Sequence, residues 1–200
     1  MLYLPPNIAH YGIALNDCMT CSVGFRAPSI SNLVSEYAEN LAANIDQALR
    51  YEDPDLVYQQ SPAEISPDAL KRIRSIIAEQ LTVDDDRLLR WFGEFSSESR
   101  SGLHTQPPDK AISTYDELAA SLTAESIIVQ SPAVKFLFAR NNDTALLFVD
   151  GSCCTSSPAF ARALTDKREI NARRLIESVD GEDDQQTLLE LYNRGCLLIP

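Results

Sequence analysis

Residues 3–10 read Tyr3-Leu-Pro-Pro-Asn-Ile-Ala-His10: an apolar run, a Pro-Pro turn signal and one histidine. Small, β-branched and mostly uncharged residues follow at 13–15 and 18–25, which predicts two extended segments that turn at Asn16-Asp17. A two-stranded hairpin is only marginally stable in water, so these strands must belong to a larger sheet. We therefore expect the chain to begin inside a domain, with residues 1–27 forming part of that sheet.

The pattern becomes helical after Pro28 and stays helical to about residue 100. Ser29 or Ser31 can cap a first helix, Ser66-Pro67 can start a second, and Asp84-Asp85-Asp86 would lie at the positive end of a third. Apolar residues recur at helical spacing in all three: Leu33, Val34, Tyr37, Leu41, Ile45 and Leu49; Leu70, Ile73, Ile76, Ile77 and Leu81; Leu88, Leu89, Trp91, Phe92 and Phe95. A short segment cannot bury this much apolar surface on itself, so we expect residues 28–108 to form a helical dimerisation region.

Residues 109–200 alternate between short helices and strands. Strands are predicted at 126–129, 134–139, 145–149 and 196–199, and helices near 113–117 and at 158–164, 171–178 and 185–193. Residues 140–144 predict a hairpin turn, Ser113 with Asp116 or Glu117 a helix cap, and Gly195 the end of the last helix. Short helices with a small hairpin are typical of a winged-helix-like domain. The sequence thus predicts an α+β protein of three parts.

Composition and charge exclude several classes of protein. With 200 residues, 44% of them hydrophobic, the chain can bury a core, which excludes wholesale disorder. No apolar run approaches the roughly 18–20 residues of a membrane span, and no export leader opens the sequence. A net charge of −12 argues against general nucleic-acid binding. The cysteines are odd in number and two are adjacent, so we expect no disulfide framework and a cytoplasmic protein.

The opening motif carries a family resemblance. A Pro-Pro turn with a histidine soon after it is how the double-stranded β-helix of cupins presents its final metal ligand. With Tyr11-Gly12, Ser22-Val-Gly-Phe-Arg-Ala-Pro28, Trp91-Phe-Gly-Glu-Phe95 and Arg100, the sequence closely resembles the bacterial ribosomal oxygenases, which are JmjC-type cupins. The resemblance implies C-terminal strands of a JmjC barrel at 1–27, a helical dimerisation segment at 28–108 and a winged-helix-like domain at 109–200. It further implies hydroxylation of an arginine in a large-subunit ribosomal protein, with iron(II), dioxygen and 2-oxoglutarate.

The same resemblance assigns roles to individual residues. His10 would be the distal histidine of the two-His, one-carboxylate triad, which leaves iron positions open for 2-oxoglutarate and dioxygen. A polar residue on the last barrel strand would lie beside the 2-oxoglutarate carboxylate; alternation offers Ser22 or Thr20, and we favour Ser22.

The sequence departs from the family at the other iron ligands. Neither of its two histidines, His10 and His104, begins a His-X-Asp or His-X-Glu motif. We therefore expect the remaining ligands, and the basic residue that pairs with the far carboxylate of 2-oxoglutarate, to lie in an N-terminal part outside this sequence. On this view the 200 residues contain no catalytic residue of their own and are inactive alone.

Other motifs have simpler structural explanations. Cys18-Met-Thr-Cys21 has the spacing of a zinc or redox pair, but no second pair completes it, and strand packing is favoured. Cys153-Cys154 is interpreted as a buried turn, and Trp91, Phe92 and Phe95 as core in preference to an interaction patch. Five basic residues between 162 and 174 could contact phosphate on a winged helix, although a solvated helix face is favoured: Arg162, Lys167, Arg168, Arg173 and Arg174.

Two hypotheses of different class follow. In the first, the chain is part of an iron(II)- and 2-oxoglutarate-dependent protein hydroxylase. In the second, it is a non-catalytic dimeric winged-helix module that acts as a regulator or adaptor. A regulator has no reason to possess the motifs at 3–10 and 22–28, so we favour the oxygenase. We expect its substrate to be a ribosomal protein and its assembly to be a homodimer. We expect neither a membrane nor a nucleic acid as partner.

Overall fold

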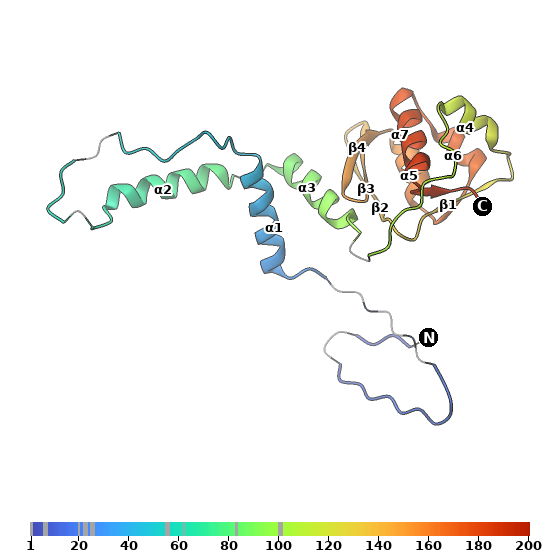
Figure 1. The fold of residues 1–200 in the computed structure, drawn as a ribbon, viewed down its shortest axis with the longest axis horizontal. Coiled ribbons are helices and arrows are strands. Elements are labelled where there is room, and N and C mark those ends of the chain that lie inside the picture. The colour runs from blue at the N-terminus through green and yellow to red at the C-terminus, as the bar shows by residue number, and fades with distance from the viewer. Residues whose placement is uncertain are drawn as a thin grey trace. The chain divides into compact units, whose positions relative to one another are not determined.

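The computed structural model describes residues 2–5, 8–19, 21, 24, 27–54, 57–61, 63–82, 84–99 and 102–200 (Figure 1). The chain divides into two compact units, residues 1–36 and 37–200. In the first, the described residues before Ile30 form a bend at 15–17 and no strand. The hydrogen-bonded strands predicted there are thus not formed in the described residues. Strand pairs are marginal without further neighbours, and the described part of the chain offers these segments no third strand.

Helix α1 (Ile30–Ala43) begins directly after a serine cap. Ser29 Oγ accepts a hydrogen bond from the Asn32 N–H at 3.1 Å, which decides between the two predicted caps. The helix ends earlier than predicted, so Ile45 and Leu49 lie beyond it. At this end the Asn44 side chain donates to the Asn40 carbonyl at 2.8 Å and satisfies one of the last free carbonyls of the helix.

Helices α2 (Pro67–Gln80) and α3 (Asp85–Ser97) begin where their caps predict. Ser66 Oγ accepts from the Ala69 N–H at 3.1 Å, and Asp84 accepts from the Arg87 N–H at 3.3 Å. The two helices differ in burial. α2 has no buried residue, whereas α3 buries Trp91, Gly93 and Ser97.

Helix α3 packs on an antiparallel sheet of strands β2 (Phe136–Asn141), β3 (Thr144–Val149) and β4 (Ser152–Ser156). β3 is buried from Ala145 onward, on both faces. A Cβ atom at Gly93 would overlap the ring of Phe148, so glycine permits the close approach of α3. The N–H of Gly151 also donates to Ser97 Oγ at 3.1 Å, which fixes the end of the helix to the β3–β4 turn.

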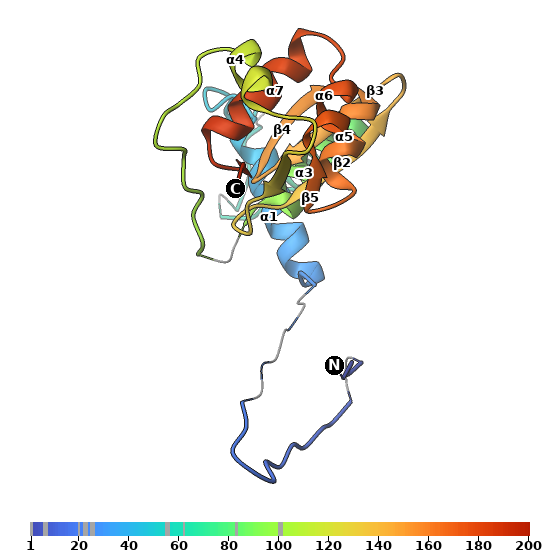
Figure 2. The ribbon, with the colours of Figure 1, turned by 90° about the vertical axis from the view of Figure 1, so that its right-hand side faces the viewer.

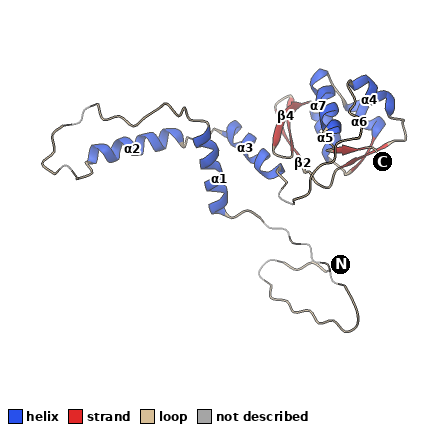
Figure 3. Ribbon diagram, in the orientation of Figure 1, coloured by secondary structure: helices blue, strands red, loops and turns tan. Residues whose placement is uncertain are grey.

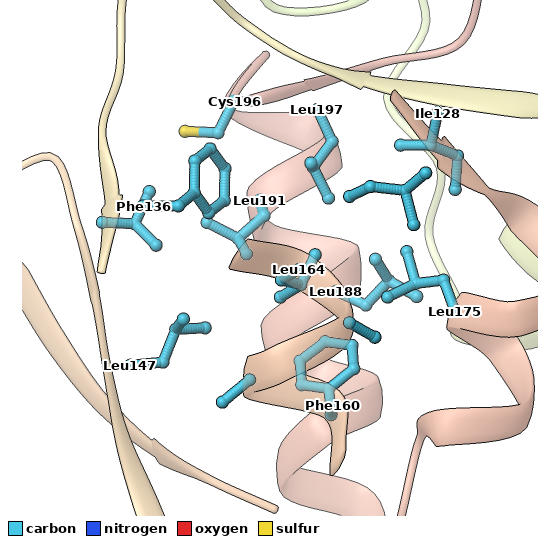
Figure 4. Close-up of a cluster of buried hydrophobic side chains, with 14 of the residues drawn as sticks. Ile128, Phe136, Leu147, Phe160, Leu164, Leu175, Leu188, Leu191, Cys196 and Leu197 are labelled. Atoms are coloured by element: carbon cyan, nitrogen blue, oxygen red, sulfur yellow. The ribbon is translucent and has the colours of Figure 1, made fainter. Parts of the chain in front are cut away.

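A second antiparallel sheet has the strand order β5 (Glu169–Asn171), β1 (Ile127–Gln130), β6 (Leu197–Leu198). Four helices pack around the two sheets: α4 (Tyr115–Ser121), α5 (Pro158–Thr165), α6 (Ala172–Ser178) and α7 (Glu182–Asn193) (Figures 2 and 3). The core lies between the sheets: Figure 4 shows Leu147 of β3 on one side, Ile128 of β1 on the other, and Leu164 and Leu188 between them.

The structure confirms the predicted hairpin and corrects the sequence-based predictions at three further places. The β2–β3 loop consists of Asn142 and Asp143, since Asn141 pairs with Thr144. Cys153 and Cys154 lie in β4, where a buried turn was expected, and β5 was not predicted. The cap of α4 is Thr114, not Ser113; Glu117 instead accepts from the Ser113 N–H at 3.1 Å. Among the described residues, no helix combines the length and apolarity that crossing a bilayer requires.

Candidate functional site

His10 is the expected metal ligand, and the structure leaves it exposed. Its Nδ1 atom lies 3.3 Å from the carbonyl oxygen of Ile8, two residues earlier. Ser22 and Thr20, the two residues considered for 2-oxoglutarate, lie outside the described residues. The structure therefore brings no second candidate group to His10 within the part of the chain that it describes.

The donor atoms of the described residues do not by themselves fit an iron ion. Nowhere in the described ranges do three His, Cys, Asp or Glu side chains lie close enough together to hold a metal. A facial triad needs two imidazoles and a carboxylate, and His10 offers one imidazole. Among the residues that the structure describes, no such set of ligands accompanies His10.

The five cysteines differ in their surroundings. Cys18 and Cys21 are exposed, and all five cysteines are free. Burial raises the pKa of the Cys153 thiol, and the nearby Arg90, which donates to its Sγ at 3.7 Å, only partly opposes this. Burial likewise raises the pKa of Cys154 and Cys196. Thiols with raised pKa values are poor nucleophiles at neutral pH, which argues against a reactive pair in β4.

The expected core role of the α3 aromatic residues holds for Trp91, which is buried, and in part for Phe95, which is partly buried. Trp91 is buried and lies between Tyr37 of α1 and Phe95, with ring centroids 4.8 Å and 5.3 Å away. Phe92 is the exception, with 48% of its surface exposed. Stacking of this kind stabilises a helix pair more than it offers a binding surface.

The basic residues between 162 and 174 separate into three environments. Arg162 and Arg174 line a surface pocket together with Arg140 of β2. Lys167 and Arg168 line a neighbouring pocket that also contains the acidic residues Asp166 and Glu169. Arg173 instead pairs with Glu177, its Nε atom 2.8 Å from the carboxylate. Sequence reasoning missed Arg140, because only the packing of α5 against β2 brings it to Arg162.

A buried carboxylate was also missed. Asp184, in the first turn of α7, is fully buried, and its oxygens accept from the Ser157 N–H at 3.0 Å, the Ser157 hydroxyl at 2.6 Å and the Asp180 N–H at 2.9 Å. Ser157 is the cap of α5. Asp184 therefore ties the start of α5 to the start of α7, a structural role that no local sequence signal indicates.

Two family models match the chain. A ROXA-like winged helix matches residues 77–197, and a JmjC domain matches residues 1–33. The first covers α3 and both sheets, and the second includes His10. The winged-helix domain expected from the alternating pattern is thus confirmed.

Relatives agree with these matches. The chain is 32% identical over 137 residues to the ribosomal protein uL16 3-hydroxylase of Escherichia coli strain K12, which covers 68% of this chain and 36% of that protein. It is 41% identical over 56 residues to a probable ribosomal oxygenase of Haemophilus influenzae, covering 28% of this chain and 12% of that protein. The chain thus spans well under half the length of these curated relatives.

Solved structures give the same picture. The crystal structure of the Escherichia coli ribosomal oxygenase YcfD superposes with a TM-score of 0.68 at 25% identity, over 89% of this chain and 48% of that one. A structure of YcfD in complex with cobalt and 2-oxoglutarate has a TM-score of 0.65 at 25% identity, over 88% of this chain and 48% of that one. The chain therefore belongs to the bacterial ribosomal oxygenase family, of which it contains the ROXA-like winged helix and a portion of the JmjC domain.

Proposed function

We propose that this chain is part of an iron(II)- and 2-oxoglutarate-dependent oxygenase that hydroxylates an arginine of a large-subunit ribosomal protein. The observation that carries this proposal is the JmjC match over residues 1–33, which includes His10 and precedes the winged-helix match. The relative from Escherichia coli is named for hydroxylation of ribosomal protein uL16, and a YcfD structure holds cobalt and 2-oxoglutarate. These names support the choice of substrate and cofactors for this chain.

In this proposal the chain contributes one iron ligand and one co-substrate contact. The imidazole of His10 would bind the metal, and the hydroxyl of Ser22 would donate to a carboxylate of 2-oxoglutarate. Bound iron would supply the activation of dioxygen. Residues 1–27 would pair with the other strands of a JmjC barrel, which are the partners that the described residues before Ile30 lack.

A turnover assay tests the proposal in two proteins. Succinate formed from 2-oxoglutarate is measured with the 200-residue chain and with a longer parent protein that has a complete JmjC domain, each alongside its His10→Ala variant. We expect no turnover by the chain above its own variant, because one imidazole cannot hold iron with open positions. Succinate from the chain that depends on His10 would show that the chain alone is active, contrary to the proposal.

The parent protein separates the oxygenase from its alternative. A non-catalytic winged-helix module predicts no consumption of 2-oxoglutarate when a peptide with the target arginine is added. The oxygenase predicts succinate in proportion to hydroxylated peptide. An inactive but correctly folded parent protein, with its metal bound, would favour the binding module.

The assembly we propose is a two-fold dimer formed through α2. Five apolar residues of this segment each expose 41–55% of their surface: Leu70, Ile73, Ile76, Ile77 and Leu81. No residue of α2 is buried, and Arg72 of this helix forms an ion pair with Asp53 at 3.1 Å. A helix face of this kind is stable in water when a second copy covers it.

Light scattering of the 200-residue chain at micromolar concentration tests the dimer. Ile77→Glu should give a monomer, because it places a charge in the apolar face. Ser75→Glu is the matched control, since helical spacing places Ser75 on the opposite side of α2. A monomeric mass for the folded unmodified chain would refute the dimer, as would an unchanged dimer in Ile77→Glu.

A further inference from the structure

A hollow lies between α5 and α6. Ala159 and Ala163 stand one turn apart on α5, and Ser178 lies on the facing side of α6. Their short side chains leave a surface pocket of ≈ 390 Å³ between the two packed helices. The position of the pocket is therefore fixed by small residues on two well-packed elements of the winged-helix domain.

Three arginines from three different elements rim this pocket: Arg140 of β2, Arg162 of α5 and Arg174 of α6. Among the residues that the structure describes, no acidic side chain lines it, and neither Arg140 nor Arg162 forms an ion pair. Arg174 has one, a long contact of 3.6 Å to Asp166 between two exposed side chains. Such a surface contact contributes little, so Arg174 can turn toward a ligand.

The concentration of positive charge is unusual for this chain, whose net charge is −12. Three guanidinium groups that line one pocket repel one another and gain from a shared anion. Guanidinium donates in a planar fork that matches the oxygens of phosphate, and several forks around one site suit a dianion better than a single carboxylate.

The rest of the domain disfavours nucleic acid as the source of that phosphate. The first turn of α7, the last helix of the winged-helix domain, exposes Glu182 and Asp183 and carries no basic residue. The neighbouring pocket, which shares Arg174 with this one, sets Lys167 and Arg168 against Asp166 and Glu169, so the acidic residues there offset the additional positive charge. A polyanion would meet this acidic surface, whereas a compact ligand would touch only the arginines.

We propose that the pocket rimmed by Arg140, Arg162 and Arg174 binds the phosphate group of a small phosphorylated molecule. The phosphate oxygens accept hydrogen bonds from the three guanidinium groups, and the apolar wall of Ala159 and Ala163 contacts the rest of the ligand. This binding site lies in the winged-helix domain and is independent of His10 and of the proposed hydroxylation.

The test is a titration of the 200-residue chain with inorganic pyrophosphate at constant ionic strength. Binding is measured by calorimetry and by amide chemical shifts. We expect saturable binding with shifts at Ala159 and Ala163. Arg140→Gln and Arg162→Gln should each weaken binding by about tenfold or more. Arg173→Gln is the matched control, since it removes the same charge from α6 at a residue paired with Glu177 outside the pocket, and it should leave the affinity unchanged.

Each other outcome overturns the proposal. If Arg173→Gln weakens binding as much as Arg162→Gln, binding depends on the net charge of the protein, and the pocket is not a specific phosphate site. If a single-stranded oligonucleotide binds through the same arginines while pyrophosphate does not saturate, the site belongs to nucleic acid. If an acidic peptide binds there and pyrophosphate does not, the ligand is a carboxylate. Exposed arginines can be replaced without loss of the fold, which the melting temperature of each variant verifies.

Discussion

Replacement of Asp184 by alanine should lower the free energy of unfolding of residues 37–200 by about 2–4 kcal/mol. The carboxylate is fully buried and accepts from two backbone N–H groups, those of Ser157 and Asp180, and from the Ser157 hydroxyl. Alanine leaves both N–H groups without a partner, at a cost of about 1–3 kcal/mol each. The hydroxyl adds little, because the Ser178 carbonyl lies 3.5 Å away as an alternative acceptor. Water that enters the space of the lost carboxylate keeps the sum below its upper limit.

Urea unfolding followed by circular dichroism measures the loss, and Asp183→Ala is its control. Asp183 occupies the same first turn of α7 but is exposed, so it shares the interaction with the helix dipole and not the buried hydrogen bonds. We expect the control to cost about 0.3–1 kcal/mol. Asp184→Asn should fall between the two, since an amide can accept two of the three hydrogen bonds but turns its NH₂ group toward the third donor. Equal losses for Asp184→Ala and Asp183→Ala would refute the reasoning.

Further expectations concern α3, a buried thiol and the proposed site. Gly93→Ala should destabilise residues 37–200 by about 1–3 kcal/mol, because the added methyl group overlaps the ring of Phe148; a stability unchanged in urea would contradict the close packing. Burial raises the pKa of Cys196, so the folded state holds this proton more tightly; stability should fall as pH rises above about 8.5, and Cys196→Ala should flatten that slope in melts at pH 7–10. In the parent protein, His10→Ala should abolish hydroxylation while changing stability by only about 1 kcal/mol, which peptide mass spectrometry and melting temperature check together. Ser22→Ala should weaken 2-oxoglutarate binding by roughly 1.5–3 kcal/mol; an unchanged apparent constant would remove that contact.

Local chemistry predicted several helix boundaries. The caps at Ser66 and Asp84 and the glycine at 195, which has φ +72°, are decided by residues within one turn of each helix end. The turn at Asn142-Asp143 is local in the same sense, and it lies inside the hairpin turn predicted at residues 140–144. Features that a few neighbouring residues determine are visible in the sequence.

Features that depend on distant partners were missed. β4 contains Cys153 and Cys154, which have no strong preference, and it is a strand because Leu147 and Phe148 of β3 pair with them. The residues before Ile30 show the converse: their pattern favours strands, but strand formation requires neighbours that the described residues do not provide. The arginine pocket joins Arg140 to residues more than twenty positions away, and no motif records that contact.

The packing of α3 against β3 limits how freely this winged-helix domain can be exchanged between proteins. Leu146 and Phe148 lie on the face of the sheet opposite the main core, and α3, about fifty residues earlier in the chain, covers that face. A recombination event that transferred only residues 109–200 would expose this face to water and create an aggregation-prone patch. The unit that evolution or an engineer can move as a module must therefore include α3, and the ROXA-like match, which starts at residue 77, does include it.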